Sequence, residues 1–249
     1  MTQVYMTVDF DYFFDYRPPE DKPWRFDWGF GENAFFREWM WYQRMAAEPE
    51  GVEVLRPEGD RNFWARLSAL GFQLPMVARV GDSHLFAAAW FGCMGHEGVQ
   101  HVVDVDYHAD CDLQNGDTRI MCDNWLLHLL LLKRQEGRPL KPIWVAKYRG
   151  ASRPSALDRW QVAVATLEEF ETLGLDKPIE VEALYIAQSS AWTPPWADDR
   201  FFEFVEASGC TLSVEKEDPP KRRGWDEARA RRMQEEMEKC RNILAAMGS

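Results

Sequence analysis

The segment His101–Asp106 has the sequence HVVDVD, and its valine content restricts the fold more than any other part of the chain. Valine favours extended backbone, and a strand that is apolar along most of its length is typical of a parallel sheet covered on both faces. Similar short apolar segments occur at Val4–Val8, Met76–Val80, Pro142–Ala146 and Ile179–Ala187. We therefore predict strands at these five places.

Segments with helical character lie between and after these strands. We predict helices at Asn33–Ala47, Asp60–Leu70 with Asp60 as N-cap, Leu85–Met94 closed by Gly95, Asn124–Arg134, Leu157–Leu173 and Trp225–Met247. Arg17–Gly31 and Glu215–Gly224 are predicted loops. The alternation predicts a three-layer α/β/α fold with a mainly parallel sheet. We expect a single domain over residues 1–249 with a charged C-terminal helix at 225–247, because no linker divides the chain.

The composition excludes several classes of function. The net charge is −12, from 41 acidic and 29 basic residues, which argues against nucleic-acid binding through phosphate contacts. The five cysteines are scattered without a CxxC pair, so neither disulfides nor a thiolate zinc site is indicated. The chain has no signal-peptide pattern, and its apolar runs are too short to span a membrane. We expect a cytoplasmic protein.

An Asp-x-His-x-Asp motif, Asp106-x-His108-x-Asp110, directly follows the valine-rich strand. If the chain stays extended, the two-residue period points these three side chains to one side and turns Tyr107 and Ala109 away. Carboxylate oxygen with imidazole nitrogen suits Mn²⁺, Fe²⁺, Zn²⁺ or Ni²⁺. An acidic turn with a solvent-facing histidine is the alternative, but the buried strand upstream favours a metal site.

Two further groups of potential ligands follow other predicted strands. Asp9-x-Asp11 holds two carboxylates close together, which requires a cation or a proton nearby unless one of them is simply exposed. His84 ends the turn Gly81-Asp82-Ser83-His84, where it is either a ligand or a neutral histidine at a helix N-terminus. Ligands in such folds lie at the carboxyl ends of the strands, so we expect one shared site. The number of ligands suits two metal ions with bridging carboxylates.

Together these motifs resemble the ureohydrolase superfamily of arginases and agmatinases. In that superfamily a Gly-Gly-Asp-His turn opens a helix, an Asp-x-His-x-Asp strand end follows, and an Asp-x-Asp strand end completes the site. The resemblance covers roughly Met76–Asp112 in order, plus the N-terminal strand. The chain departs from the pattern by an extra residue in the turn before His84. It also carries its Asp-x-Asp strand first rather than last, as in a circular permutation.

Three short segments are similar to a divergent branch that contains the peptide arginases. They are Val8–Phe13 (VDFDYF), Asp123–Trp125 (DNW) and Ser189–Pro195 (SSAWTPP). Those enzymes convert arginine side chains of ribosomally made precursor peptides to ornithine and release urea. The resemblance implies a three-layer α/β/α fold and a binuclear Mn²⁺ site, with two ions per chain.

The same resemblance implies a ligand set for each ion. It assigns one ion to His84, Asp106, Asp110 and Asp9, and the other to His108, Asp106, Asp9 and Asp11. Hydroxide between the two ions would attack the guanidinium carbon, and ornithine and urea would follow.

Residues for proton transfer and substrate binding are less restricted by the pattern. His128 is the candidate proton shuttle, although its apolar helical segment favours a histidine that only packs on its helix. His96 and His101 are alternatives, and His101 begins its strand at the end opposite the site. Asp112, Asp117 and Asp123 can pair with a guanidinium. We assign Asp112 to substrate binding and Asp123 to catalysis, while a solvated turn remains the alternative. Ser189, Ser190 and Trp192 are candidates for the mouth of the site.

Two other functions fit parts of the pattern. A mono-zinc deacetylase of the histone-deacetylase-like fold is one, because Val103–His108 is similar to a strand of that family. The chain lacks the adjacent histidine pair that those enzymes use. A non-catalytic module that binds a basic peptide in an acidic, Trp-rich cleft is the other. The expected partner is an arginine-containing precursor peptide or a small guanidino substrate. The helix at 225–247 can pack on its own domain or on a partner chain, so a homo-oligomer is one alternative.

Overall fold

One parallel sheet organises the part of the chain that the computed structural model describes, residues 1–15, 34–47, 55–95, 97–111, 119–148 and 155–247. Its eight strands follow the order β6-β5-β4-β1-β7-β3-β8, and β2 also pairs with β7. All ladders between them are parallel. The strands are β1 (Thr2–Asp9), β2 (Phe72–Gln73), β3 (Val77–Gly81), β4 (His101–Asp106), β5 (Lys141–Ala146), β6 (Ala163–Ala165), β7 (Ile179–Ala187) and β8 (Thr211–Val214).

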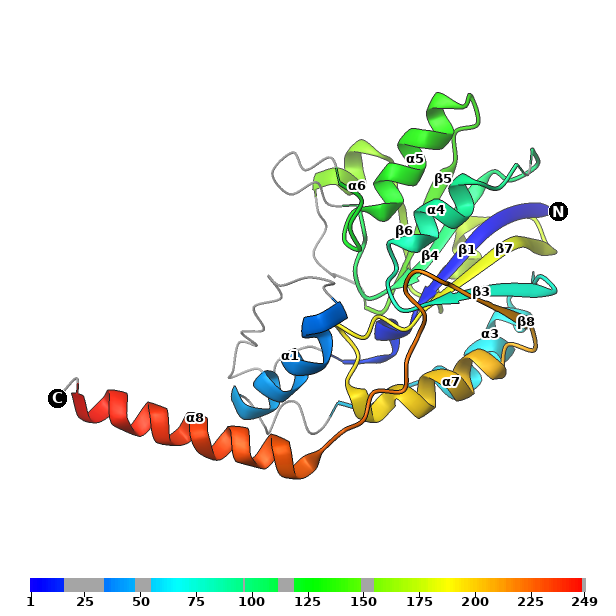
Figure 1. Cartoon of the computed structure of the whole chain (residues 1–249). Coiled ribbons are helices and arrows are strands. Elements are labelled where there is room, and N and C mark those ends of the chain that lie inside the picture. The colour runs from blue at the N-terminus through cyan, green and yellow to red at the C-terminus, as the bar shows by residue number, and fades with distance from the viewer. Residues whose placement is uncertain (16–33, 48–54, 96, 112–118, 149–154, 248–249) are drawn as a thin grey trace.

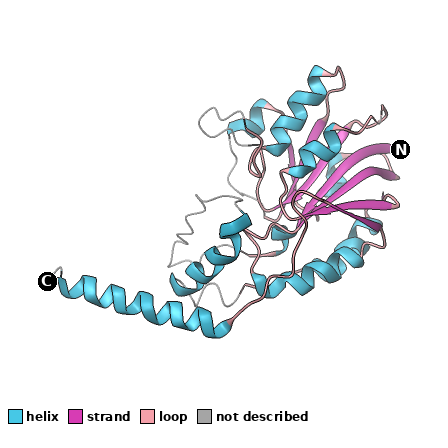
Figure 2. Ribbon diagram, in the orientation of Figure 1, coloured by secondary structure: helices cyan, strands magenta, loops and turns pink. Residues whose placement is uncertain are grey.

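Helices lie on both sides of this sheet, so the predicted three-layer α/β/α fold is confirmed (Figures 1 and 2). The α-helices are α1 (Ala34–Ala47), α3 (Phe63–Ala69), α4 (Phe86–Gly92), α5 (Trp125–Gln135), α6 (Ser155–Arg159), α7 (Asp198–Glu206) and α8 (Glu227–Met247). Short 3-10 turns are η1 (Phe10–Phe13), η2 (Asp60–Asn62), η4 (Phe170–Leu173) and η5 (Pro195–Ala197). Among the helices of the described residues, none combines the length and apolarity needed to cross a lipid bilayer.

Each face of the sheet is covered by its own apolar layer. On one face, Tyr5 of β1 stacks on Phe91 of α4 with ring centroids 5.1 Å apart, and Trp125 of α5 belongs to the same cluster. On the other face, Phe63 of α3 and Phe204 of α7 pack against the strands at 5.7 Å from each other. Burial on both faces is the reason why the strands are nearly continuous apolar runs.

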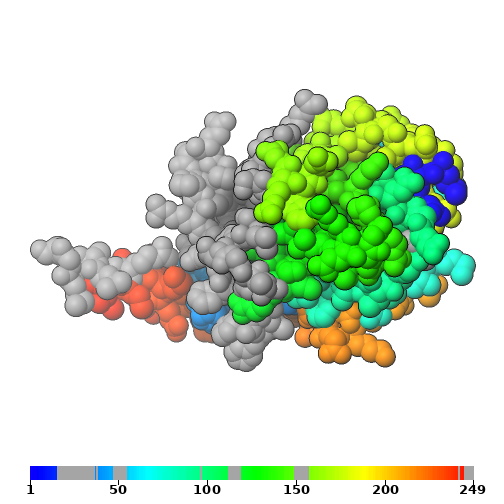
Figure 3. All heavy atoms as spheres, turned by 90° about the horizontal axis from the view of Figure 1, so that it is seen from above, coloured from blue at the N-terminus to red at the C-terminus, as the bar shows by residue number. Residues whose placement is uncertain are grey.

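The helices α1 and α8 lie beyond the carboxyl ends of the strands (Figure 1). Trp41 of α1 donates its indole N–H to the carbonyl of Ser190, 2.9 Å away. Tyr42 of α1 stacks on Trp225, just before α8, with ring centroids 4.6 Å apart. The helix α8 packs against α1, and its C-terminal part lies at one edge of the molecule (Figure 3).

The strand predictions are confirmed, and those for His101–Asp106 and Ile179–Ala187 match both ends of the strands. The prediction of helix over Leu157–Leu173 is wrong, because this segment contains α6, β6 and η4. Its middle residues, Ala163–Ala165, pair with β5 and so satisfy the backbone groups of what would otherwise be an open sheet edge. The elements α7 and β8 were not predicted.

Two predicted helix caps are also wrong. The helix α4 ends at Gly92, so Gly95 lies beyond its C-cap, Cys93. Asp60 is the first residue of η2 rather than the N-cap of α3, which is Asn62, and its carboxylate pairs with Arg200 at 2.6 Å. The predicted loop Arg17–Gly31 lies outside the described residues.

Candidate metal centre

The candidate ligands gather at the carboxyl ends of neighbouring strands. Asp9 ends β1, Asp106 ends β4, and His84 follows β3 by three residues. The order β4-β1-β7-β3 brings these strand ends together. In the parallel register Asp9 pairs with Ala187, and Ala187 pairs with Gly81. The chain therefore delivers ligands from distant segments to one edge of the sheet.

His84 is the centre of a first cluster. Its Nδ1 lies 2.9 Å from Asp106 Oδ2, 3.0 Å from Asp110 Oδ2 and 3.2 Å from Asp9 Oδ2. The imidazole is fully buried, and Nδ1 makes no hydrogen bond of good geometry within the described residues. Ligand atoms of Asp9, His84 and Asp106 all lie within 4.8 Å of one another. A buried nitrogen that faces three carboxylates fits a metal ion.

His108 forms a second cluster that shares Asp106 with the first. Its Nδ1 lies 3.1 Å from Asp11 Oδ2 and 3.8 Å from Asp106 Oδ1. Ligand atoms of Asp11, Asp106 and His108 lie within 4.8 Å of one another. The His108 side chain is 41% exposed, whereas that of Asp11 is 1% exposed. The second cluster therefore lies at the mouth of the site and the first lies beneath it.

Neighbouring groups orient these carboxylates. The Trp125 indole N–H donates to Asp110 Oδ2 at 2.6 Å, and the Ser189 hydroxyl donates to Asp9 Oδ2. The His108 backbone N–H donates to Asp106 Oδ1 at 2.8 Å. Hydrogen bonds of this kind hold metal ligands in place and tune their basicity.

Two residues behind His84 were missed by sequence reasoning. Thr7 Oγ1 lies 2.5 Å from His84 Nε2, and Asp104 Oδ1 lies 3.7 Å from the same nitrogen. Both Asp104 oxygens are buried without a hydrogen-bond partner in the described structure. These neighbours favour a proton on Nε2, which leaves Nδ1 as the nitrogen that can bind metal. The available signal was an aspartate inside a valine-rich strand.

The carboxylates lie too deep and too close together to remain charged without compensation. Burial, together with Asp110 and Asp9, raises the pKa of Asp106 from 3.8 to about 7. Burial raises the pKa of Asp9 as well, and the charge of Asp11 adds to this effect. Burial opposes the His108 cation, but Asp11 and then Asp106 outweigh it and raise the pKa of His108 to about 10. The metal-free cluster therefore retains protons that a cation would replace.

The side chains of the Asp-x-His-x-Asp motif come together through a different backbone geometry from the one that the sequence predicted. The strand ends at Asp106, and the following residues form bends rather than extended chain. Asp110 has φ of 41°, in the left-handed region that aspartate enters more readily than most residues. The expectation of alternation along a strand is therefore wrong here. A bend, not the two-residue period, turns Asp110 back towards His84.

The structure places the remaining predicted residues less centrally. His128 is on α5, where its Nε2 is buried without a hydrogen-bond partner, and it belongs to neither cluster of the described residues. Asp123 is half-buried just before α5 and also lies outside both clusters. Trp192 packs on His108 with ring centroids 5.1 Å apart, so it lies at the mouth as expected. Asp112, Asp117 and His96 fall outside the described residues.

Ser190 has a structural role beside the site. Its hydroxyl donates to Asp82 Oδ2 at 2.6 Å. Asp82 also pairs with the buried Arg37, which in turn contacts Asp218 at 3.0 Å. This network fixes the loop that carries Ser189.

The donor set consists of carboxylate oxygen and imidazole nitrogen, and neither cluster contains cysteine. Such a set fits hard and borderline divalent ions. Comparisons with models of protein families, with curated proteins and with solved structures find no match to this chain. The chemistry of the site must therefore be argued from its own geometry.

Proposed function

We propose that the protein is a binuclear manganese hydrolase of the ureohydrolase type. Its substrate would be the guanidinium group of arginine residues in a ribosomally made precursor peptide, and its products ornithine and urea. The observation that carries the proposal is the sharing of the buried Asp106 by two carboxylate–imidazole clusters, one buried and one at the mouth of the site.

Charge balance supports two ions rather than one. Burial and the charge of Asp106 raise the pKa of Asp104 well above its usual value, so this carboxyl would stay protonated and neutral. The other buried carboxylates of the site are Asp9, Asp11, Asp106 and Asp110, and two divalent cations would balance these four charges. A single ion would leave uncompensated negative charge in a buried site of low dielectric constant, and this would cost free energy of folding. This argument disfavours the mono-zinc deacetylase.

The residues of the chain would divide the work as follows. His84, Asp9, Asp106 and Asp110 would hold the inner ion, and His108, Asp11 and Asp106 the outer one. Asp9, which the resemblance assigned to both ions, belongs only to the inner cluster. When bound, such a pair of ions lowers the pKa of coordinated water and supplies a nucleophile at neutral pH. The exposed edge of His108 and the ring of Trp192 border the entrance. An aromatic ring at this place suits a guanidinium through cation–π contact.

A urea-release assay tests the proposal directly. The protein would be loaded with Mn²⁺ and given free arginine, agmatine and arginine-containing peptides, and peptide products would be checked for ornithine by mass spectrometry. We expect two ions per chain, and urea mainly from peptides. Asp106→Asn should abolish urea release, whereas Asp176→Asn, an exposed control away from the ligands, should not change it.

The same experiment separates the alternatives. One tightly bound Zn²⁺ per chain would contradict the two-ion site and favour a deacetylase. Peptide binding without urea from any substrate would instead favour a non-catalytic module.

A further inference from the structure

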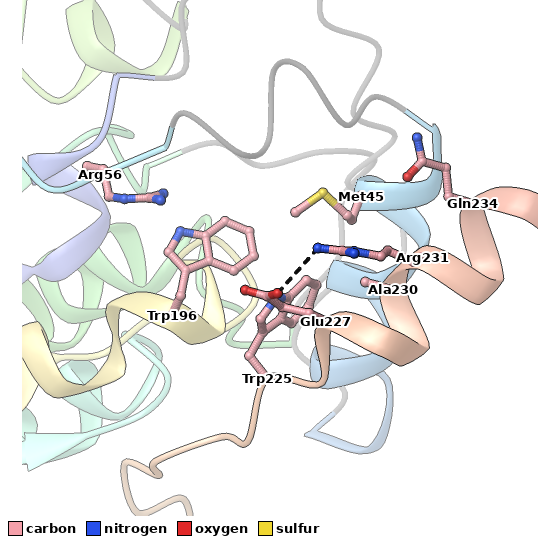
Figure 4. A pocket seen from close by; sticks show the side chains of 8 residues that line it. All are labelled: Met45, Arg56, Trp196, Trp225, Glu227, Ala230, Arg231 and Gln234. Atoms are coloured by element: carbon pink, nitrogen blue, oxygen red, sulfur yellow. Dashed lines mark ion pairs between the residues drawn. The ribbon is translucent and has the colours of Figure 1, made fainter.

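A cavity of about 350 Å³ lies between η5, α1 and α8, away from the metal ligands (Figure 4). Trp196 and Trp225 form two adjoining walls, with ring centroids 4.9 Å apart and planes at 70°. Ligand pockets span roughly 300–1,000 Å³, so this one is suited to a single large side chain rather than to a whole cofactor. The full lining is Met45, Arg56, Trp196, Trp225, Glu227, Ala230, Arg231 and Gln234.

The walls of the cavity are held in place by their own contacts. The Trp196 indole N–H donates to the carbonyl of Leu55 at 3.0 Å. Trp225 stacks on Tyr42 with planes only 10° apart. Trp41 packs on Trp196 from behind, with centroids 5.9 Å apart. A preformed aromatic cavity loses little conformational freedom when a side chain enters it.

The rim of the cavity is basic although the chain as a whole is acidic. Arg56 and Arg231 border it against a single acidic residue, Glu227, which lies 3.7 Å from Arg231 (Figure 4). Among the lining residues, two are basic and one is acidic, so the lining carries a net charge of +1, whereas the whole chain carries −12. The Arg231 side chain is 77% exposed, so its charge faces solvent. Such a rim attracts a segment rich in carboxylates.

One loop joins this cavity to the metal centre. It begins at Ser189, which is bonded to Asp9, continues through Trp192, which packs on His108, and reaches Trp196 in the cavity wall. Trp192 and Trp196 are four positions apart in the chain, which corresponds to at most about 14 Å. An extended peptide rises about 3.3 Å per residue. A peptide held at both places therefore spans the distance with a few residues.

We propose that this cavity docks an acidic segment of the substrate peptide and takes one aromatic or large aliphatic side chain against the walls that Trp196 and Trp225 form. The docked residue lies roughly four to six positions from the arginine that is modified. The inference rests on the proposed function, because it assigns the second contact of the same substrate. Such a docking site would let an acidic protein with an acidic metal site bind a peptide that carries carboxylates near its arginine.

The test uses fluorescent peptides with one arginine, an acidic segment, and one phenylalanine at varied spacing from the arginine. Binding is measured by fluorescence anisotropy on full-length metal-free protein, and urea release is measured with Mn²⁺. The double variant Arg56→Glu/Arg231→Glu should weaken binding at least about tenfold. The control Arg134→Glu, which reverses an exposed charge on α5, should leave binding and urea release unchanged.

Replacement of the peptide phenylalanine by serine should weaken binding to the wild type by about tenfold or more, since a buried aromatic side chain contributes roughly 1.5–3 kcal/mol. Unchanged binding to the double variant, or equal binding of a peptide with lysines in place of the acidic residues, would overturn the docking site. If short arginine peptides release urea but no charge-dependent peptide binding is observed, only the docking site is contradicted. Charge-dependent binding without urea from any peptide contradicts only the proposed reaction.

Discussion

Asp106 belongs to both candidate ligand clusters. Its replacement therefore separates two effects on folding stability, the destabilisation by a buried carboxylate without metal and the stabilisation by bound metal. Without metal, the pKa of Asp106 rises from 3.8 to about 7 because of burial, Asp110 and Asp9. The folded state then binds this proton more tightly than the unfolded state. Its stability therefore falls as pH rises from about 4 to above 7. Three pKa units correspond to about 4 kcal/mol.

We expect Asp106→Asn to remove most of this cost, because the amide is uncharged and keeps an oxygen that can accept the His108 backbone N–H. At about pH 8 and without metal, the variant should be more stable than the wild type by up to about 4 kcal/mol. The difference should disappear as pH falls towards about 4, where the wild-type carboxyl is protonated.

Mn²⁺ should reverse this order of stability. An ion at one hundred times its dissociation constant stabilises the folded state by about 2.7 kcal/mol, and two sites by about twice that. The wild type gains this stabilisation, whereas Asp106→Asn loses a ligand of both sites and gains little.

Urea denaturation followed by tryptophan fluorescence measures both effects, with EDTA or with Mn²⁺, near the two pH values. Asp176→Asn is the matched control and should behave as the wild type does. The reasoning fails if Asp106→Asn destabilises the metal-free protein at the higher pH, or if Mn²⁺ leaves the wild type unchanged.

Three further predictions concern the surroundings of the site. Because His108 has a pKa of about 10 without metal, Mn²⁺ must displace its proton. The affinity for Mn²⁺ should therefore rise with pH, and titration calorimetry in several buffers should detect the released proton. An affinity for Mn²⁺ that does not change with pH would contradict this prediction. Trp125→Phe removes the hydrogen-bond donor to Asp110 and should lower the affinity for one of the two ions by about 10–100-fold in titration calorimetry. An equal loss of affinity at both sites would argue against separate clusters. Arg37→Met leaves the buried carboxylates of Asp82 and Asp218 without the cation between them and should cost about 3–5 kcal/mol of unfolding free energy. An unchanged denaturation midpoint would show that the ion pairs contribute little.

Local sequence determined the strands and the identity of the candidate metal ligands. Valine-rich segments such as His101–Asp106 form strands because their side chains need burial on both faces. Asp9, His84 and Asp106 were recognisable because each is a metal-ligand residue type just after an apolar run. These properties depend on side-chain chemistry within a few residues, so they can be predicted without the fold.

Tertiary structure decided how the candidate ligands are arranged in space. The strand order set which carboxylates share a histidine, and a left-handed bend rather than strand alternation turned Asp110 inward. It also revealed Asp104 and Thr7 behind His84, and it placed Trp196 and Trp225 side by side although they are 29 positions apart. Each of these depends on contacts between segments distant in sequence and on burial that raises the pKa of acidic groups, and neither is encoded in any short stretch of residues.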